Sequence, residues 1–176
     1  LEAVKPIGEA TDTGTTVTFR PDPEIFETLV YNYNTLATRM RETAFLNSGL
    51  QLTLTDLRER DESGKHREEI FHSEGGLKEF VVYLDESRTK LIEEPIYVKG
   101  KEDNVEVEVA MQYNTSYSEN LYSYVNNINT REGGTHVAGF RRAVNREFDK
   151  YAKENGLFNK VKFKISGEDF REGLTA

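Results

Sequence analysis

Apolar side chains recur at helical spacing in three segments of the chain. In residues 32–47 most apolar positions lie three or four apart, and the run ends in the stop signal Asn-Ser-Gly. Residues 77–86 place four apolar side chains on one helical face, and residues 136–155 continue such a face until Gly156. The pattern therefore predicts three amphipathic helices, of which the last is the longest.

Other segments alternate between apolar and polar side chains, or are rich in Val, Ile and Tyr, which is typical of β-strands. They are residues 14–19, 50–57, 70–73, 96–99, 105–113, 120–127 and 161–165. The polar run between the second and third segments predicts a hairpin with an exposed tip. Residues 96–127 are expected to form an antiparallel set of strands, and Ser166 with Asp169 resembles a helix-capping start.

The order of these elements predicts an α+β fold, with mixed strands packed on one side by helices. At 176 residues the chain is long enough for one domain and part of a neighbour. Leu1 is not an initiator methionine, and the last four residues begin a new apolar segment. We therefore expect the chain to be an excerpt from a longer protein.

The net charge of −8 is unevenly distributed along the chain. Residues 131–164 contain nine basic and four acidic side chains, so that this segment is +5 and the remainder −13. The basic residues are Arg131, Arg141, Arg142, Arg146, Lys150, Lys153, Lys160, Lys162 and Lys164. Such asymmetry indicates one anion-facing surface on an acidic body, although ordinary solvated helix faces remain the alternative.

Composition argues against several kinds of site. The chain has no cysteine, which excludes disulfides and thiolate metal sites, and its three histidines (His66, His72 and His136) are too scattered for a zinc site. No segment has the roughly 20 apolar residues of a membrane helix, and the N-terminus lacks a signal peptide. We expect a cytoplasmic protein without a membrane partner and without a metal site of its own.

No pattern in the sequence fixes a catalytic constellation such as a nucleophile elbow or a P-loop. The loop of residues 131–135 precedes a predicted helix and could present backbone N–H groups to an anion. Two glycines and a threonine are equally common at ordinary helix starts. His136, at the start of that helix, and His72, beside a strand end, are expected to be structural.

One string is long and specific: VNNINTREGGTHVAGFRRAV, residues 125–144. It resembles a signature of the B subunits of bacterial type II DNA topoisomerases, above all those of DNA gyrase. The similarity continues in the expected order through TGTTVTF, LATRMRETAFLNSGL, FHSEGGLKEFVVYL, VEVAMQYNTSYSEN and GEDFREGLTA. The amino acids at residues 112–114 and 126–130 resemble gyrase more closely than topoisomerase IV.

The resemblance implies an architecture. Residues 1–20 would be the closing strand of an ATPase domain of the type found in heat-shock protein 90, MutL-type repair proteins and histidine kinases. Residues 21–176 would be most of a transducer domain, with a βαβ fold like that of a ribosomal protein domain. In this family the transducer relays the nucleotide state to the DNA-handling parts, coupling ATP binding and hydrolysis to strand passage and supercoiling. The implied partners are DNA, the gyrase A subunit and a second B subunit.

The resemblance also implies which site residues are here and which are elsewhere. The catalytic Glu, the Mg²⁺-binding Asn and the glycine-rich lid of the family precede Leu1, and a phosphate-binding Lys follows Ala176. ATP and Mg²⁺ would therefore serve the full-length protein, and the fragment would neither bind ATP nor act as a catalyst alone. Thr15 matches a residue near the adenine.

By the same resemblance, Arg141 in Gly139-Phe140-Arg141 lines the cavity through which the transported DNA segment passes. Helical spacing turns Arg141 away from the apolar face and leaves it free to meet a partner. A surface pair with Glu147 or another acid is the alternative. Two other identities also stay open, namely a topoisomerase IV B-subunit transducer and a nucleic-acid or protein interaction module without chemistry.

Overall fold

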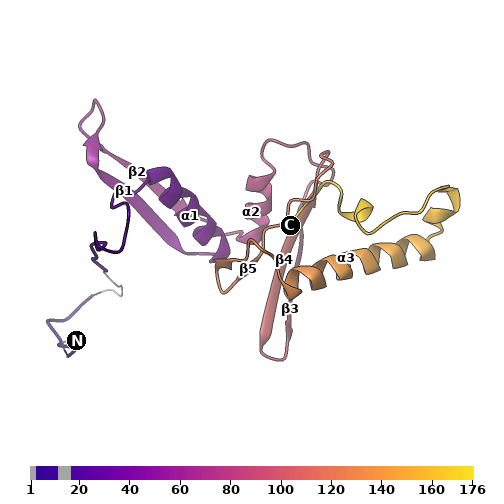
Figure 1. The fold of residues 1–176 in the computed structure, drawn as a ribbon, viewed down its shortest axis with the longest axis horizontal. Coiled ribbons are helices and arrows are strands. Elements are labelled where there is room, and N and C mark those ends of the chain that lie inside the picture. The colour runs from indigo at the N-terminus through magenta and orange to yellow at the C-terminus, as the bar shows by residue number, and fades with distance from the viewer. Residues whose placement is uncertain (1–2, 12–16) are drawn as a thin grey trace. The chain divides into compact units, whose positions relative to one another are not determined.

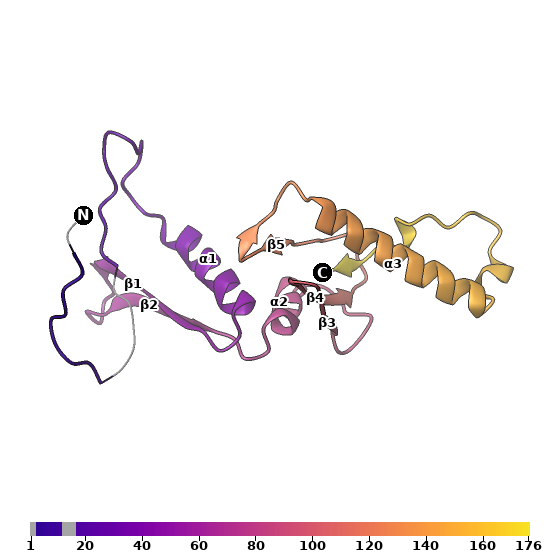
Figure 2. The same cartoon turned by 90° about the horizontal axis from the view of Figure 1, so that it is seen from below.

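The structure, a computed structural model, describes residues 3–11 and 17–176. The chain divides into two compact units, Leu1–Asn32 and Tyr33–Ala176. Every helix and strand found in the described residues belongs to the second unit (Figures 1 and 2). In chain order these are α1 (Tyr33–Leu46), β1 (Gln51–Arg60), β2 (His66–His72), α2 (Leu77–Leu84), β3 (Ile96–Glu102), β4 (Val105–Tyr113), β5 (Tyr124–Val125), β6 (Ile128–Asn129), α3 (Thr135–Glu154), η1 (Leu157–Lys160), η2 (Asp169–Arg171) and β7 (Leu174–Thr175).

The first unit is irregular where it is described. Asp22 organises a turn by accepting the backbone N–H of Phe26 at 2.9 Å, and the rings of Phe19 and Tyr31 meet edge to face. The strand expected at residues 14–19 lies partly outside the described residues, and its described part, 17–19, is in no strand. The domain boundary after residue 20 stays a prediction.

The first helix packs along the first hairpin, and the sequence predicts both elements. Tyr33, Ala37 and Ala44 of α1 are buried in one cluster with Phe71 of β2, and Leu52 of β1 packs against this cluster. β1 and β2 are antiparallel, with Leu52 opposite Phe71. Figure 1 shows α1 lying along the two strands, whose connecting tip is exposed. The apolar face of the helix, set by its 3.6-residue period, packs on the apolar face of the strands, set by their two-residue period.

A second layer forms where α2 packs against β4. β4 pairs with β3 along its length and with β7 at its far end, all antiparallel. Phe80 and Val81 of α2 and Ala110 of β4 are buried. These elements confirm the predicted helix at 77–86 and the predicted strands at 96–99 and 105–113.

The strand expected over residues 120–127 is wrong in extent. Only Tyr124 and Val125 are in a strand, and they pair with β6 across a tight turn. Asn126 and Asn127 both have positive φ, 49° and 65°, which asparagine tolerates better than most residues. The chain therefore reverses inside the segment that the sequence pattern presents as continuous.

The third helix is confirmed, and the strand expected after it is wrong. α3 ends before Gly156, which adopts the left-handed conformation with φ 63°. Residues 161–165 are in no strand, since alternation alone supplies no neighbouring strand to pair with. The capping start expected at Ser166 is found only in part. Asp169 Oδ2 accepts the backbone N–H of Ser166 at 2.6 Å, but η2 begins at Asp169, and its N-cap, Glu168, makes no side-chain capping hydrogen bond.

The described residues thus form an α+β structure of antiparallel sheets and α-helices, as predicted from the sequence.

Candidate functional site

Arg141 lies on the flank of α3, next to the apolar face of that helix. Val137 and Val144 are buried and Phe140 is half-buried, so they define the packed face. Successive helical residues are rotated by about 100°. Arg141 is accordingly exposed over 44% of its side chain, in the position that the sequence predicts.

Arg141 is nevertheless not free, and the alternative of a surface pair with an acid other than Glu147 is the one found. Its Nε donates to Glu119 Oε1 at 2.8 Å, and this hydrogen bond raises the pKa of the guanidinium. Glu147, the acid that the sequence suggested as an alternative partner, instead accepts from Arg146 Nε at 3.0 Å. Glu119 is 22 residues away in sequence and lies off the helix, so helical periodicity could not reveal it.

Glu119 has a second cationic neighbour, Arg171 of η2. Arg171 Nε lies 3.2 Å from the same carboxylate oxygen, although it is not aligned to donate a hydrogen bond. Arg171 is buried, and its Nη1 donates to Asn145 Oδ1 at 2.6 Å and to the Gly167 carbonyl at 2.5 Å. Three segments distant in sequence therefore meet at one carboxylate.

The turn that follows Arg171 depends on Gly173. Its φ is +74°, and a Cβ at this position would overlap the carbonyl oxygen of Asn114. Only glycine allows the backbone to approach so closely while its φ is positive. This turn leads from η2 into β7 and so fixes where Arg171 reaches Glu119.

Five basic side chains of α3 are exposed to solvent. The exposed basic residues of this helix are Arg141, Arg142, Arg146, Lys150 and Lys153. Arg146 pairs with Glu147 and Lys153 with Asp149, but these pairs are largely exposed. Exposed pairs contribute only about 0.2–1 kcal/mol and exchange readily with other anions. This helix holds five of the nine basic residues and three of the four acidic residues of 131–164, so it carries +2 of the +5 excess.

Side chains on either side of the glycine loop before α3 contact each other. Thr130 Oγ1 lies 3.0 Å from His136 Nε2 and 2.6 Å from Ser123 Oγ. Gly134 has φ 152°, and a Cβ there would be 2.9 Å from His136 Nδ1. His136 therefore has a structural contact, as expected, and so has His72, whose Nδ1 lies 3.2 Å from the Leu50 carbonyl oxygen.

A buried polar network, which the sequence did not reveal, joins α2 to β4 and β7. Asp85 is fully buried, and its carboxylate accepts from Thr175 Oγ1 at 2.6 Å and from Asn114 Nδ2 at 2.9 Å. Arg88 Nη1 adds a third hydrogen bond at 2.8 Å. A buried carboxylate with three donors is satisfied, so the network fixes these elements without exposing a reactive group.

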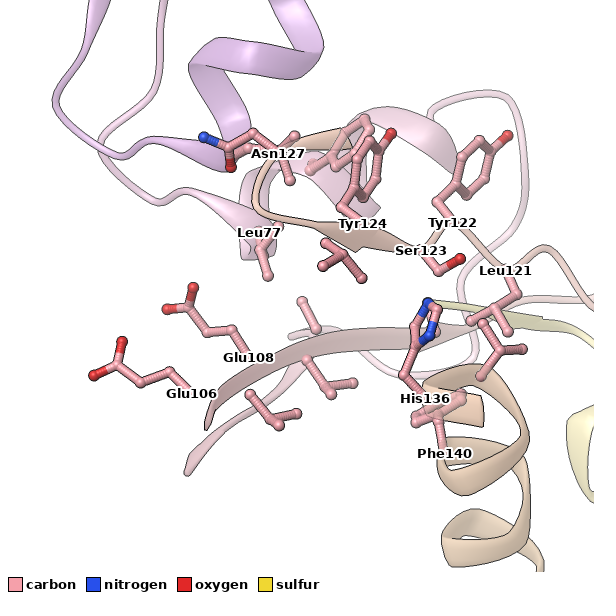
Figure 3. Close-up of a pocket in the computed structure, with 18 of the residues that line it drawn as sticks. Leu77, Glu106, Glu108, Leu121, Tyr122, Ser123, Tyr124, Asn127, His136 and Phe140 are labelled. Carbon is pink, nitrogen blue, oxygen red and sulfur yellow. The ribbon is translucent and has the colours of Figure 1, made fainter. Parts of the chain in front are cut away.

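An open groove of about 820 Å³ lies between α2, β4, residues 121–125 and the first turns of α3 (Figure 3). It runs along the edge of β4 that β7 pairs with only at Gln112 and Tyr113. In Figure 3 the carboxylates of Glu106 and Glu108 lie at one end and His136 at the other. The ionisable groups therefore do not converge, and the groove has the geometry of an open strand edge rather than of a catalytic pocket.

The residue predicted to lie near the adenine cannot be placed. Thr15 lies outside the described residues. Across residues 3–11 and 17–176, no group of three or more His, Cys, Asp or Glu side chains is placed to hold a metal ion. Within those same ranges, no helix combines the length and apolar character that crossing a membrane requires.

Comparison with known proteins identifies the family. The family model described as DNA gyrase B matches residues 76–176, a span that runs from just before α2 to β7 and includes Glu119, Arg141 and Arg171. The chain belongs to the DNA gyrase B family.

Similar DNA gyrase B proteins are known from several bacteria. The chain is 56% identical over 174 residues to the DNA gyrase B subunit of Eisenibacter elegans and 57% identical over 173 residues to that of Cytophaga hutchinsonii. These alignments cover 99% and 98% of the chain but 36% of each relative. The chain therefore spans about a third of the length of these gyrase B relatives.

Solved gyrase B structures have the same fold. The 43K ATPase domain of Thermus thermophilus gyrase B, solved in complex with an aminocoumarin, matches with a TM-score of 0.73 and 36% identity. It is aligned over 88% of the chain and 40% of its own length. The B-subunit of the DNA gyrase from Myxococcus xanthus matches with a TM-score of 0.71 and 28% identity, over 88% of the chain and 41% of that structure.

Proposed function

We propose that the chain is the transducer region of a DNA gyrase B protein, and that it couples ATP binding and hydrolysis to DNA strand passage and supercoiling. The observation that carries the proposal is the gyrase B match over residues 76–176. The likeness to a solved gyrase B ATPase domain supports it further. In this proposal the complete protein is an ATP-dependent type II DNA topoisomerase that acts with the gyrase A subunit and a second B subunit.

ATP and Mg²⁺ are proposed as ligands of the complete protein. Among the described residues there is no metal-binding cluster, and the ionisable groups of the groove along β4 do not converge. Thr15, proposed to lie near the adenine, is outside those residues. The chain on its own is therefore proposed to be non-catalytic.

The role proposed for Arg141 is to contact the phosphates of a DNA segment in transit. Phosphate contacts position DNA without reading its bases, and a transported segment has to be released again. An exposed guanidinium on a basic helix suits such a contact, because it supplies charge and donors without enclosing the DNA. The pairing with Glu119 means that DNA has to compete for this guanidinium.

The test is replacement of Arg141 by Gln in the complete enzyme. Losing one phosphate contact that exchanges with an internal pair should cost on the order of 1 kcal/mol, or roughly five-fold in the DNA concentration that half-stimulates ATP turnover. Supercoiling should fall as well. The response to DNA is measured as the ratio of ATP turnover with and without DNA, and supercoiling is measured in parallel.

Arg39→Gln is the control, since Arg39 on α1 is 47% exposed, pairs with Glu42 at 2.9 Å and also donates to the Asn127 carbonyl at 2.8 Å. It removes the same charge from a side chain of similar exposure. Equal responses of the two variants, or an unchanged response of Arg141→Gln to DNA, would show that Arg141 does not contact the transported segment.

A further inference from the structure

One carboxylate oxygen serves two arginines at the flank of α3. Glu119 Oε1 lies 2.8 Å from Arg141 Nε and 3.2 Å from Arg171 Nε. Glu119 comes from the loop after β4, Arg141 from α3 and Arg171 from η2. The three side chains form one ion-pair network, in which the negative Glu119 lies between the positive Arg141 and Arg171.

The two arginines of this network differ in how firmly the fold holds them. Arg171 is buried and also donates to Asn145 and to the Gly167 carbonyl. Arg141 has 44% of its side chain exposed, against 10% for Arg171. Arg141 is therefore the member that can leave Glu119 for another anion at low cost.

Glu119 itself is fixed by its backbone as well as by Arg171. The next residue, Asn120, donates its N–H to the Leu174 carbonyl at 2.8 Å and accepts the N–H of Ala176 at 3.0 Å. The side chain of Glu119 is 20% exposed. The carboxylate is thus held beside Arg141 whether or not Arg141 remains bound to it.

We propose that Glu119 sets the strength with which Arg141 holds a DNA phosphate, by competing with the phosphate for the Arg141 guanidinium. This inference rests on the DNA contact proposed for Arg141. Glu119 occupies Arg141 Nε, so a phosphate can use the whole guanidinium fork, Nε together with Nη, only when Glu119 gives up that donor.

The experiment uses the complete enzyme and measures the concentration of linear duplex DNA that half-stimulates ATP turnover. Glu119→Gln should lower that concentration on the order of two- to five-fold, the range expected when a partly exposed ion pair no longer has to be broken. The difference in half-stimulating DNA concentration between Glu119→Gln and the wild type should shrink as salt rises, because salt screens the Glu119–Arg141 pair of the wild type. Glu147→Gln is the matched control, since it removes the same charge from an acid of α3 that contacts Arg146 and not Arg141.

A double variant shows whether the effect passes through Arg141. In an Arg141→Gln background, Glu119→Gln should give no further gain, because the guanidinium for which it competes is gone. A gain that persists in this background, or an equal gain from Glu147→Gln, would mean that Glu119 acts only through the general charge of the surface.

Glu119→Gln leaves the buried Arg171 without its acid, which could prevent folding. The pair Glu119→Gln with Arg171→Gln leaves no buried charge unpaired and keeps the net charge of the protein unchanged, while it also removes the hydrogen bonds of Arg171 to Asn145 and Gly167. It should give the same gain in DNA response as Glu119→Gln. No gain from either variant, while Arg141→Gln still weakens the response to DNA, would overturn the role of Glu119 and leave that of Arg141 standing. No effect from Arg141→Gln would remove both.

Discussion

Replacing Asp85 by alanine should be a severe single change to the stability of the second unit. The carboxylate lies where α2 ends and receives hydrogen bonds from Thr175, Asn114 and Arg88 at 2.6, 2.9 and 2.8 Å. Asp85 and Thr175 are 0% exposed and Asn114 is 1% exposed. Water therefore cannot reach two of the three donors if the acceptor is removed.

The size of the loss follows from which partners can recover. Arg88 is 33% exposed and can be hydrated, so its lost bond costs little. Asn114 Nδ2 keeps a weaker partner in Thr175 Oγ1 at 3.2 Å, but the Thr175 hydroxyl loses its acceptor. A buried group left without a partner costs about 1–3 kcal/mol, and removing one member of a buried charged network costs about 3–5 kcal/mol. We expect Asp85→Ala to lower the free energy of unfolding by about 3–4 kcal/mol, a large part of the total for a domain.

Urea unfolding of the chain, followed by circular dichroism, measures this change. Asp149→Ala is the control, because Asp149 is 44% exposed and its pair with Lys153 at 2.6 Å lies on the helix surface. That variant should lose no more than about 0.5 kcal/mol. Asp85→Asn, which keeps the shape and one acceptor, should fall between the two. A loss below about 1 kcal/mol for Asp85→Ala, or equal losses for both alanine variants, would refute the reasoning from buried donors.

Three further predictions concern the ends and the surface of the chain. Calorimetric titration of the chain with a non-hydrolysable ATP analogue and Mg²⁺ should show no binding at micromolar strength, and tight Mg²⁺-dependent binding would contradict the proposed division of roles. In the complete protein, Thr15→Val should raise the Michaelis constant for ATP, by the equivalent of about 1–3 kcal/mol for one buried hydrogen bond, and an unchanged constant would leave Thr15 a structural role. The hydrogen bonds from Arg58 lower the pKa of Asp56 from 3.8 to about 2. This contact therefore stabilises the fold above pH 3.8, and the stabilisation is lost as the pH falls toward 2. A carboxyl NMR titration should give that low midpoint and Arg58→Gln should return it toward 3.8, whereas equal midpoints in the two proteins would mean that Arg58 is not the cause.

The sequence determined the elements whose signal is local. The period of apolar residues was enough to place α1, α2 and α3 to within a few residues, because each helix buries one continuous face. The hairpin of β1 and β2 followed from strict alternation around a polar tip, and Gly156 marked the end of α3. The exposed position of Arg141 also followed, since its angle from Phe140 on the helix is fixed by the backbone.

Only the tertiary structure decided what depends on residues distant in the chain. Residues 161–165 alternate like a strand but have no strand to pair with, and residues 120–127 reverse at two asparagines instead of continuing. The partner of Arg141 is 22 residues away, and Thr175 reaches Asp85 across 90 residues. No local pattern encodes these distances, because a charged or polar side chain is bound by whatever the folded backbone brings within about 3 Å. The pairing of the exposed Arg141 guanidinium with Glu119 could therefore be known only from the folded chain.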